Sequence, residues 1–412
     1  MLSRRALIVY LSAAALAASA AANAFAADKT VTIGLSLSLT GADAQSAQKV
    51  RDGALMAIEE ANAKGGVAGY KIEAMVLDDG TATAGQYDPA QAATNARKMV
   101  ADTKVVAAIG PQMSGSGKAM APILSQGNLA TVTPMSTNPD ITDPKFAQQY
   151  RPKGKPVYFR TVTTDAFQGP NMANFYADTL KAKSVYVLDD SGAFGVGIAN
   201  SFQAQAEKRG IKILGRDQIN PKETDYTTIL TKIKSLNADS LYYGGVAQAG
   251  VKLAKQSADI LPNVAKGSGD GLASADFLKG AGFPAAEGWY ITIAAPHMLE
   301  EPKVKEWVER YQKKYNSSPE DYSITAYDGA LVIIDAIKRV AESGKEVTRD
   351  NVRDAIQQTK IDTLQGEVAF DDNGDIRNRV VSVFKVTKDA AHPLDDLSHQ
   401  FKYVGVAPQS SS

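Results

Sequence analysis

The stretch that decides the fold runs over residues 108–137 and reads AIGPQMSGSGKAMAPILSQGNLATVTPMST. The apolar run that enters it, 105–109, has the β-branched content of a buried parallel strand and stops at a Gly-Pro pair. A loop of small residues at 114–117 then leads into an expected helix at 119–126. A second apolar run ends in a hydroxyl-rich turn at 133–137. This order of strand, loop, helix and strand predicts one unit of a parallel α/β sheet.

The two turns of this unit should lie at the same edge of the sheet. Carboxyl ends of neighbouring parallel strands meet there, and open α/β sheets bind ligands at that edge. Backbone N–H groups at the start of a helix, with Ser and Thr hydroxyls beside them, suit a small anion such as a carboxylate. The same residue types also make ordinary turns and helix caps. The pattern alone therefore leaves a binding role and a purely structural role open.

The alternation of strands and helices continues in two series. The first runs from the strand at 31–39 to the strand at 129–132. After a long loop at 138–156, the strand at 157–162 resumes the order, and the second series includes the strands at 184–188 and 289–295. Such alternation is typical of parallel sheets covered by helices on both faces. We therefore expect an α/β protein of two similar lobes, each a parallel-sheet α/β sandwich.

Composition excludes several function classes. The 412 residues, 44% hydrophobic and 22% charged, fit a globular protein of two domains. Because 45 Lys and Arg balance 45 Asp and Glu, nucleic acid is a poor partner. The chain has no Cys and only three His, so thiol catalysis, disulfides and Cys-based zinc sites are excluded. We expect no metal, no cofactor and no enzymatic activity.

The N-terminus has the pattern of a secretory signal peptide. Arg4-Arg5 precede an apolar stretch rich in Ala and Leu, and Ala24-Phe25-Ala26 supplies the small-residue cleavage site. We expect cleavage after Ala26, with cleavage after Ala24 as the alternative. The mature protein should be exported, and the periplasm is its expected location.

Asp270 is a separate candidate. It lies among Gly267, Gly269 and Gly271, in a loop beyond a buried strand. A carboxylate in such a loop is well placed to receive an ammonium group, although a structural role is equally open from the sequence.

Several short motifs, spread over nearly the whole mature chain, together resemble the periplasmic leucine/isoleucine/valine-binding proteins, which are type I solute-binding proteins of ABC transporters. The motifs are ANAKGGVAG at 61–69, Asp78-Asp79, Ile109-Gly110, Thr133-Pro134, Arg160-Thr161, Gln168-Gly169-Pro170, Tyr242-Tyr243-Gly244-Gly245 and Glu287-Gly288.

The resemblance implies a set of ligand-binding residues. Ser114 and Thr137 match the family's contacts to the α-carboxylate of the ligand, and Met135 matches the residue whose backbone carbonyl meets the ammonium group. Asp270 matches the acidic ammonium partner. Pocket-lining aromatic residues of the family fall at Ser46, Phe194 and Val246, and two of these three positions carry no ring here.

The resemblance also implies the domain organisation of a type I periplasmic binding protein, with three hinge crossings near Thr163, Ile293 and Gly366. The expected parts are a signal peptide at 1–26, an N-terminal lobe at 27–163 and 294–365, a C-terminal lobe at 164–293 and 366–406, and a disordered tail at 407–412.

The function implied is capture of an amino acid, branched-chain or otherwise apolar, by a monomer that closes on its hinge and delivers the ligand to an ABC permease in the inner membrane. Two alternatives stay open at this point. One is a protein of the same fold that binds an aromatic or aliphatic carboxylic acid without an ammonium group, and the other is a sensor that reports its ligand to a signalling partner.

Overall fold

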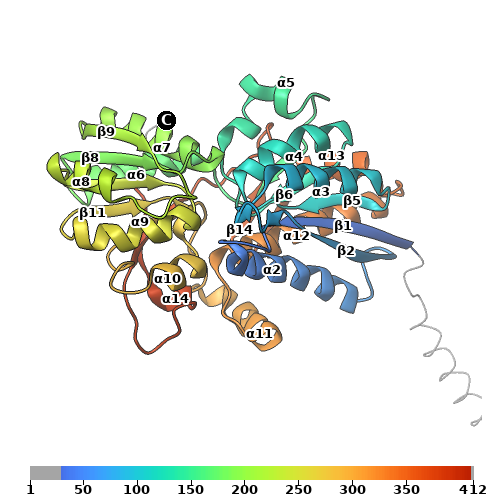
Figure 1. Cartoon of the computed structure of the whole chain (residues 1–412). Coiled ribbons are helices and arrows are strands. Elements are labelled where there is room, and N and C mark those ends of the chain that lie inside the picture. The colour runs from blue at the N-terminus through green and yellow to red at the C-terminus, as the bar shows by residue number, and fades with distance from the viewer. Residues whose placement is uncertain (1–28, 410–412) are drawn as a thin grey trace, which may run out of the picture.

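The computed structural model describes residues 29–409, and the predicted signal peptide lies outside them. Two α/β lobes lie side by side (Figure 1). The first contains a five-stranded parallel sheet in the order β2-β1-β5-β6-β7. Its elements are β1 (Lys29–Leu37), α2 (Ala44–Ala63), β2 (Tyr70–Asp78), β3 (Gly80–Thr81), β4 (Gln86–Tyr87), α3 (Pro89–Ala101), β5 (Val105–Ile109), α4 (Ser114–Gln126), β6 (Ala130–Thr133), α5 (Ala147–Tyr150), β7 (Tyr158–Arg160), α11 (Lys305–Tyr315), α12 (Asp321–Glu342), α13 (Arg349–Gln357), β13 (Lys360–Thr363) and β14 (Gly366–Ala369).

The second lobe contains a seven-stranded sheet in the order β16-β15-β12-β11-β10-β8-β9. The pairings from β9 to β12 are parallel, whereas β15 and β16 are antiparallel. Its elements are α6 (Asp165–Asp178), β8 (Ser184–Asp189), α7 (Ala193–Lys208), β9 (Lys212–Gln218), α8 (Thr227–Ser235), β10 (Ser240–Gly244), α9 (Ala247–Ile260), β11 (Ala265–Ser268), α10 (Ala275–Ala281), β12 (Tyr290–Ile293), β15 (Ser382–Val386), α14 (Leu397–Gln400) and β16 (Phe401–Val406).

Helices cover both faces of the first sheet because its strands are apolar on both faces. The strand β5 is buried along its whole length. Alternate β1 residues such as Ile33 and Leu35 pack in one cluster with α2 and α12, whereas Ala108 of β5 packs with α3 and α4 in another. Both turns at the carboxyl ends of β5 and β6 are thereby held at the edge that faces the second lobe (Figure 1).

The helix after β5 begins earlier than expected. We expected a loop at 114–117, but these residues form the first turn of α4. Gly and Ser have low helix propensity, yet burial decides here. Gly117 packs directly against the hydroxyl of Tyr158, where a Cβ atom would collide.

The third crossing between the lobes lies later than Gly366. The Phe370 ring packs on that of Phe159 at 5.2 Å, and the Gly374 carbonyl accepts a hydrogen bond from the Arg160 N–H at 3.1 Å. The segment that starts at Gly366 therefore packs on the first lobe, and the chain reaches the second lobe only with β15.

Two further differences concern the C-terminal region and the tail. The strand β16 was not expected, and it completes the edge of the second sheet. Ala407, at the expected start of a disordered tail, is buried and donates its N–H to the Val381 carbonyl at 2.8 Å. The expected disorder is therefore wrong for Ala407, and residues 410–412 of the expected tail lie outside the described residues.

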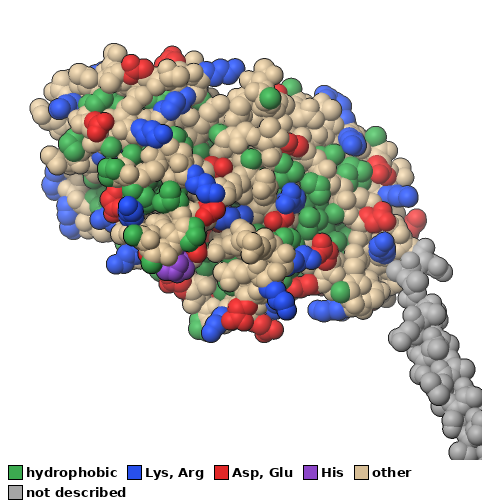
Figure 2. All heavy atoms as spheres, turned by 60° about the horizontal axis from the view of Figure 1, so that its bottom comes forward, with side chains coloured by type: hydrophobic (Ala, Val, Ile, Leu, Met, Phe, Trp, Pro, Cys, Tyr) green, Lys and Arg blue, Asp and Glu red, His purple; other side chains and the backbone are tan. Residues whose placement is uncertain are grey.

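The surface carries charged side chains of both signs, scattered over the face in Figure 2, as the equal numbers of basic and acidic residues suggest. Within residues 29–409, no helix is both long and apolar enough to cross a membrane, and no group of three or more acidic or His side chains could hold a metal ion.

A buried arginine holds the hydroxyl-rich turn after β6. Arg160 is fully buried and pairs with the Asp375 carboxylate at 2.7 Å. It also donates to the backbone carbonyls of Ser136 and Asn138, the latter at 2.8 Å. Because these carbonyls flank Thr137, Arg160 fixes the geometry of the turn.

Replacing Arg160 by Leu should destabilise the protein by about 3–5 kcal/mol, since it leaves Asp375 and two carbonyls without their partner. The matched control is Lys155→Met, which breaks an exposed ion pair with Asp354 worth about 0–1 kcal/mol. Urea unfolding followed by circular dichroism measures both. Equal costs for the two variants would contradict this role of Arg160.

Candidate ligand-binding site

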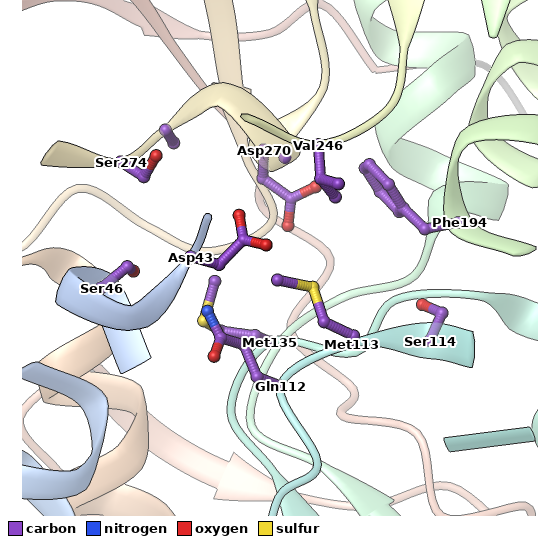
Figure 3. Close-up of a pocket in the computed structure, with 12 residues that line it drawn as sticks. Asp43, Ser46, Gln112, Met113, Ser114, Met135, Phe194, Val246, Asp270 and Ser274 are labelled. Atoms are coloured by element: carbon purple, nitrogen blue, oxygen red, sulfur yellow. The ribbon is translucent and has the colours of Figure 1, made fainter. Parts of the chain in front are cut away.

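A cavity lies between the two lobes (Figure 3). Six of the seven predicted binding residues line it: Ser46, Ser114, Met135, Phe194, Val246 and Asp270. The remaining lining residues are Asp43, Gln112, Met113, Gly271, Ala273 and Ser274. Both lobes therefore contribute side chains to one cavity, and contact of these residues with a ligand stays a prediction.

The two turns that the sequence singled out meet at the cavity. Ser114 begins α4, and its hydroxyl accepts the N–H of Asn138 at 3.2 Å. Thr137, the residue before Asn138, is buried but is not among the residues that line the cavity. Its hydroxyl lies beside the Asp165 carboxyl and lowers the pKa of that group. Thr137 is thus close to Ser114, as expected, but set back from the cavity.

Asp270 points its carboxylate into the cavity (Figure 3). The Tyr322 hydroxyl donates to one carboxylate oxygen at 2.6 Å, and the Gln168 amide donates to the other at 3.0 Å. Burial raises the pKa of Asp270, and these two hydrogen bonds act in the opposite direction. The next residue must be Gly271, because a Cβ atom there would collide with the Gly245 carbonyl.

Asp165, which was not among the predicted residues, is linked to Asp270 through the side chain of Gln168. The Gln168 amide bridges the two carboxyl groups, with a distance of 2.9 Å to Asp165. Burial and the nearby charge of Asp270 both raise the pKa of Asp165. Ionisation of one of these two carboxyl groups therefore disfavours ionisation of the other. The signal in the sequence was Gln168-Gly169-Pro170, quoted above only as a family motif.

Asp43 is the second acidic residue in the cavity, and it was also missed. It directly precedes α2, and its carboxylate points into the cavity (Figure 3). Burial, together with the charges of Asp276 and Asp190, raises the pKa of Asp43 to about 8, although a hydrogen bond from the Ala247 backbone acts in the opposite direction. An Asp just after a strand that ends at the ligand-binding edge was the available signal.

Much of the remaining lining is apolar, although Gln112 and three Ser side chains are also part of it. Met113, Phe194 and Val246 belong to one buried cluster, with Met135 beside the same cavity. Val246 is positioned by its N–H, which the Asp190 carboxylate accepts at 3.0 Å. No Lys, Arg or His is among the lining residues. The cavity therefore suits an apolar body with a positively charged group.

Direct contacts hold the lobes together over the cavity. The Asn138 amide donates to the Ala193 carbonyl at 2.8 Å, and the Gln248 amide donates to the Ala84 carbonyl at 3.1 Å. The Ser46 N–H donates to the Asp276 carboxylate at 3.1 Å. Each bond joins one lobe to the other, so the structure is a closed arrangement.

Because the pKa of Asp43 is raised in the folded protein, the free energy of unfolding should depend on pH. Between about pH 4 and pH 8 the folded protein keeps a proton on Asp43 that the unfolded chain has lost, so stability falls as pH rises through this range. Asp43→Asn removes that ionisation and keeps an oxygen acceptor for the Ala247 backbone. The variant should raise the melting temperature of the ligand-free protein by about 2–4 °C at pH 8.

The gain from Asp43→Asn should shrink as the pH falls and vanish at about pH 3, where the wild-type carboxyl is protonated in both states. Asp354→Asn is the control, because the pKa of Asp354 is lowered by Arg353 and Lys155 despite some burial, and its replacement should not stabilise at pH 8. Thermal unfolding at several pH values measures both. A gain for Asp43→Asn that is independent of pH would contradict the assignment.

The sequence of the chain is similar to that of known periplasmic binding proteins. A sequence profile described as periplasmic binding protein matches residues 30–391. The leucine-, isoleucine-, valine-, threonine- and alanine-binding protein of Pseudomonas aeruginosa is 30% identical, over 92% of this chain and 96% of its own. The Leu/Ile/Val-binding protein BraC3 of Rhizobium johnstonii is 31% identical, over 86% of this chain and 91% of its own.

A solved structure supports the same placement. The leucine-binding protein LivK of Thermotoga maritima superposes with a TM-score of 0.78 at 27% identity, covering 92% of this chain and 98% of its own. The predicted two-lobed α/β fold is confirmed by this match. On the profile, the relatives and the shared fold together, the chain belongs to the periplasmic binding protein family that includes the leucine/isoleucine/valine-binding proteins.

Proposed function

We propose that the protein captures an amino acid in the periplasm and delivers it to the permease of an ABC importer in the inner membrane. The observation that carries this proposal is the cavity that Ser114 enters from one lobe and Asp270 from the other. The names of the relatives point to branched-chain and other apolar amino acids as ligands. The role is binding and release without catalysis, by a monomer whose signal peptide is removed on export.

The two ends of an amino acid match the two walls of the cavity. The ligand's α-carboxylate would accept hydrogen bonds from the Ser114 hydroxyl and from backbone N–H groups at the start of α4, where the helix dipole favours negative charge. Thr137 would contribute if closure on a ligand turned its hydroxyl toward the carboxylate. The ammonium group would donate to Asp270 and to the backbone carbonyl of Met135. Phe194, Val246 and Ser46 would then contact the ligand side chain.

Binding of this kind can be tight although each contact is modest. A hydrogen bond to a charged group contributes about 1.5–3 kcal/mol net. Four such bonds in a site closed from water are enough for a micromolar dissociation constant, which corresponds to about −8 kcal/mol. The ligand would close the lobes by binding both at once, because it gains the second set of contacts only in the closed state.

The charge on Asp270 gives a direct test. Asp270→Asn keeps the side-chain shape, and we expect it to weaken leucine binding about 10–100-fold, the equivalent of one charge-assisted hydrogen bond. Binding of 4-methylpentanoate, which is leucine without its ammonium group, should change less than about threefold. Isothermal titration calorimetry measures both ligands against both proteins.

Asp354→Asn, a change at an exposed ion pair far from the cavity lining, is the control and should leave both affinities unchanged. Equal weakening of leucine and 4-methylpentanoate by Asp270→Asn would refute the ammonium role. Tighter binding of 4-methylpentanoate than of leucine by the wild-type protein would favour the alternative, a carrier of plain carboxylic acids.

A further inference from the structure

Asp43 occupies a helix-capping position without capping. It is the residue before the first turn of α2, where Asp is favoured because its carboxylate accepts N–H groups of that turn. Here the side chain makes no capping hydrogen bond. Its carboxylate turns into the cavity instead (Figure 3), where one carboxylate oxygen is buried and has no hydrogen-bond partner.

A residue of the other lobe takes over the capping. Asp276, in α10, accepts the Ser46 N–H of the first turn of α2 at 3.1 Å. A backbone N–H in the first turn of α2 is therefore hydrogen-bonded to a carboxylate of the other lobe, and the Asp43 side chain does not cap the helix. Asp276 itself does not line the cavity.

Asp43 keeps its proton in the ligand-free protein, but a cationic donor beside its unpartnered oxygen would favour the ionised carboxylate and supply the missing partner. A buried carboxylate oxygen without a partner costs free energy that a ligand donor can recover. The cation nearest along the chain, Lys49 of α2, is occupied: it pairs with Glu320 at 3.2 Å and donates to the Asp395 carbonyl at 2.9 Å. No cationic side chain lines the cavity, whereas Asp43 and Asp270 both face it.

Asp43 and Asp270 enter the cavity from different lobes. Asp270 comes from the second lobe and is engaged by Tyr322 and Gln168, whereas Asp43 comes from the start of α2, beside Ser46. The side chains of Met113 and Met135 lie in the same cavity and offer an apolar path for an alkyl chain. The burial and charge that raise the pKa of Asp43 would both be offset by a cation.

We infer that Asp43 determines ligand specificity by receiving a terminal ammonium group on the ligand's side chain. Among the amino acids that the cavity admits, the preferred ones are then those with an unbranched alkyl side chain ending in an amine, such as lysine and ornithine. This inference rests on amino-acid capture as proposed above, but it assigns basic amino acids to the site in place of the apolar ones that the names of the relatives suggest.

The test compares two ligands that differ in one group. Lysine and norleucine share their backbone and most of an unbranched side chain, but only lysine ends in an ammonium group. Wild-type protein should bind lysine at least 10-fold more tightly than norleucine in isothermal titration calorimetry. Asp43→Asn, which retains shape and an acceptor oxygen, should reduce that ratio at least 10-fold and change norleucine binding less than threefold.

Asp276→Asn is the matched control, because it neutralises a buried acid at the same helix end without altering the cavity lining. It should shift the affinities for lysine and norleucine together and leave their ratio within threefold of the wild-type value. Threonine and glutamine, run beside them, test whether a neutral hydroxyl or amide donor satisfies Asp43 equally well.

The outcomes separate this inference from the proposed function. Tighter binding of norleucine than of lysine, equal binding of glutamine and lysine, or a parallel loss of both ligands in Asp43→Asn overturns the role of Asp43 while amino-acid capture stands. Binding of none of these amino acids overturns both.

Discussion

The hydrogen bond from the Tyr322 hydroxyl to the Asp270 carboxylate is the interaction on which the rest of the site depends. Tyr322 lies at the start of α12, which packs on the first sheet, whereas Asp270 follows β11 in the second. The bond therefore joins the lobes inside the molecule, at 2.6 Å and fully buried. It holds a carboxylate at the gap, and the Tyr322 hydroxyl is itself held by the Ala294 N–H at 3.1 Å.

Burial of several carboxyl groups between the two lobes costs free energy whenever these groups are ionised without a partner. Asp43, Asp165 and Asp270 are all buried near one cavity, and no basic side chain lines it. A carboxyl group in such surroundings favours its neutral form unless a cation or several donors face it. Asp270 has two donors, Asp165 accepts from the Gln168 amide, and one oxygen of Asp43 has no partner within the protein. A ligand with positive charge would therefore stabilise the closed state more than a neutral one.

The fold could be predicted from the sequence because its strands are apolar and its turns are placed at regular intervals. The strand at 105–109 was predicted residue for residue. The prediction failed where packing overrides local preference: four Ser and Gly residues from 114 form a helical turn, and α6 was missed because Gly169 and Pro170 lie inside it. The third crossing was misplaced since nothing local indicates that Phe370 packs on Phe159.

The sequence predicted six of the residues that line the cavity but not Asp43. Ser114, Met135 and Asp270 follow strands at the ligand-binding edge, and the family resemblance pointed to them. Asp43 follows β1 at the same edge, but an Asp before a helix usually caps it, so the sequence indicated no other role. Only the structure shows that Asp276, more than two hundred residues away, caps α2 in its place.

A crystal structure of the protein grown with a saturating amino acid tests the central claim most directly. The account predicts the ligand's ammonium group within about 3 Å of the Asp270 carboxylate and its α-carboxylate at the Ser114 hydroxyl and the start of α4. A ligand bound in the reverse direction, or bound outside the space between the lobes, would contradict it.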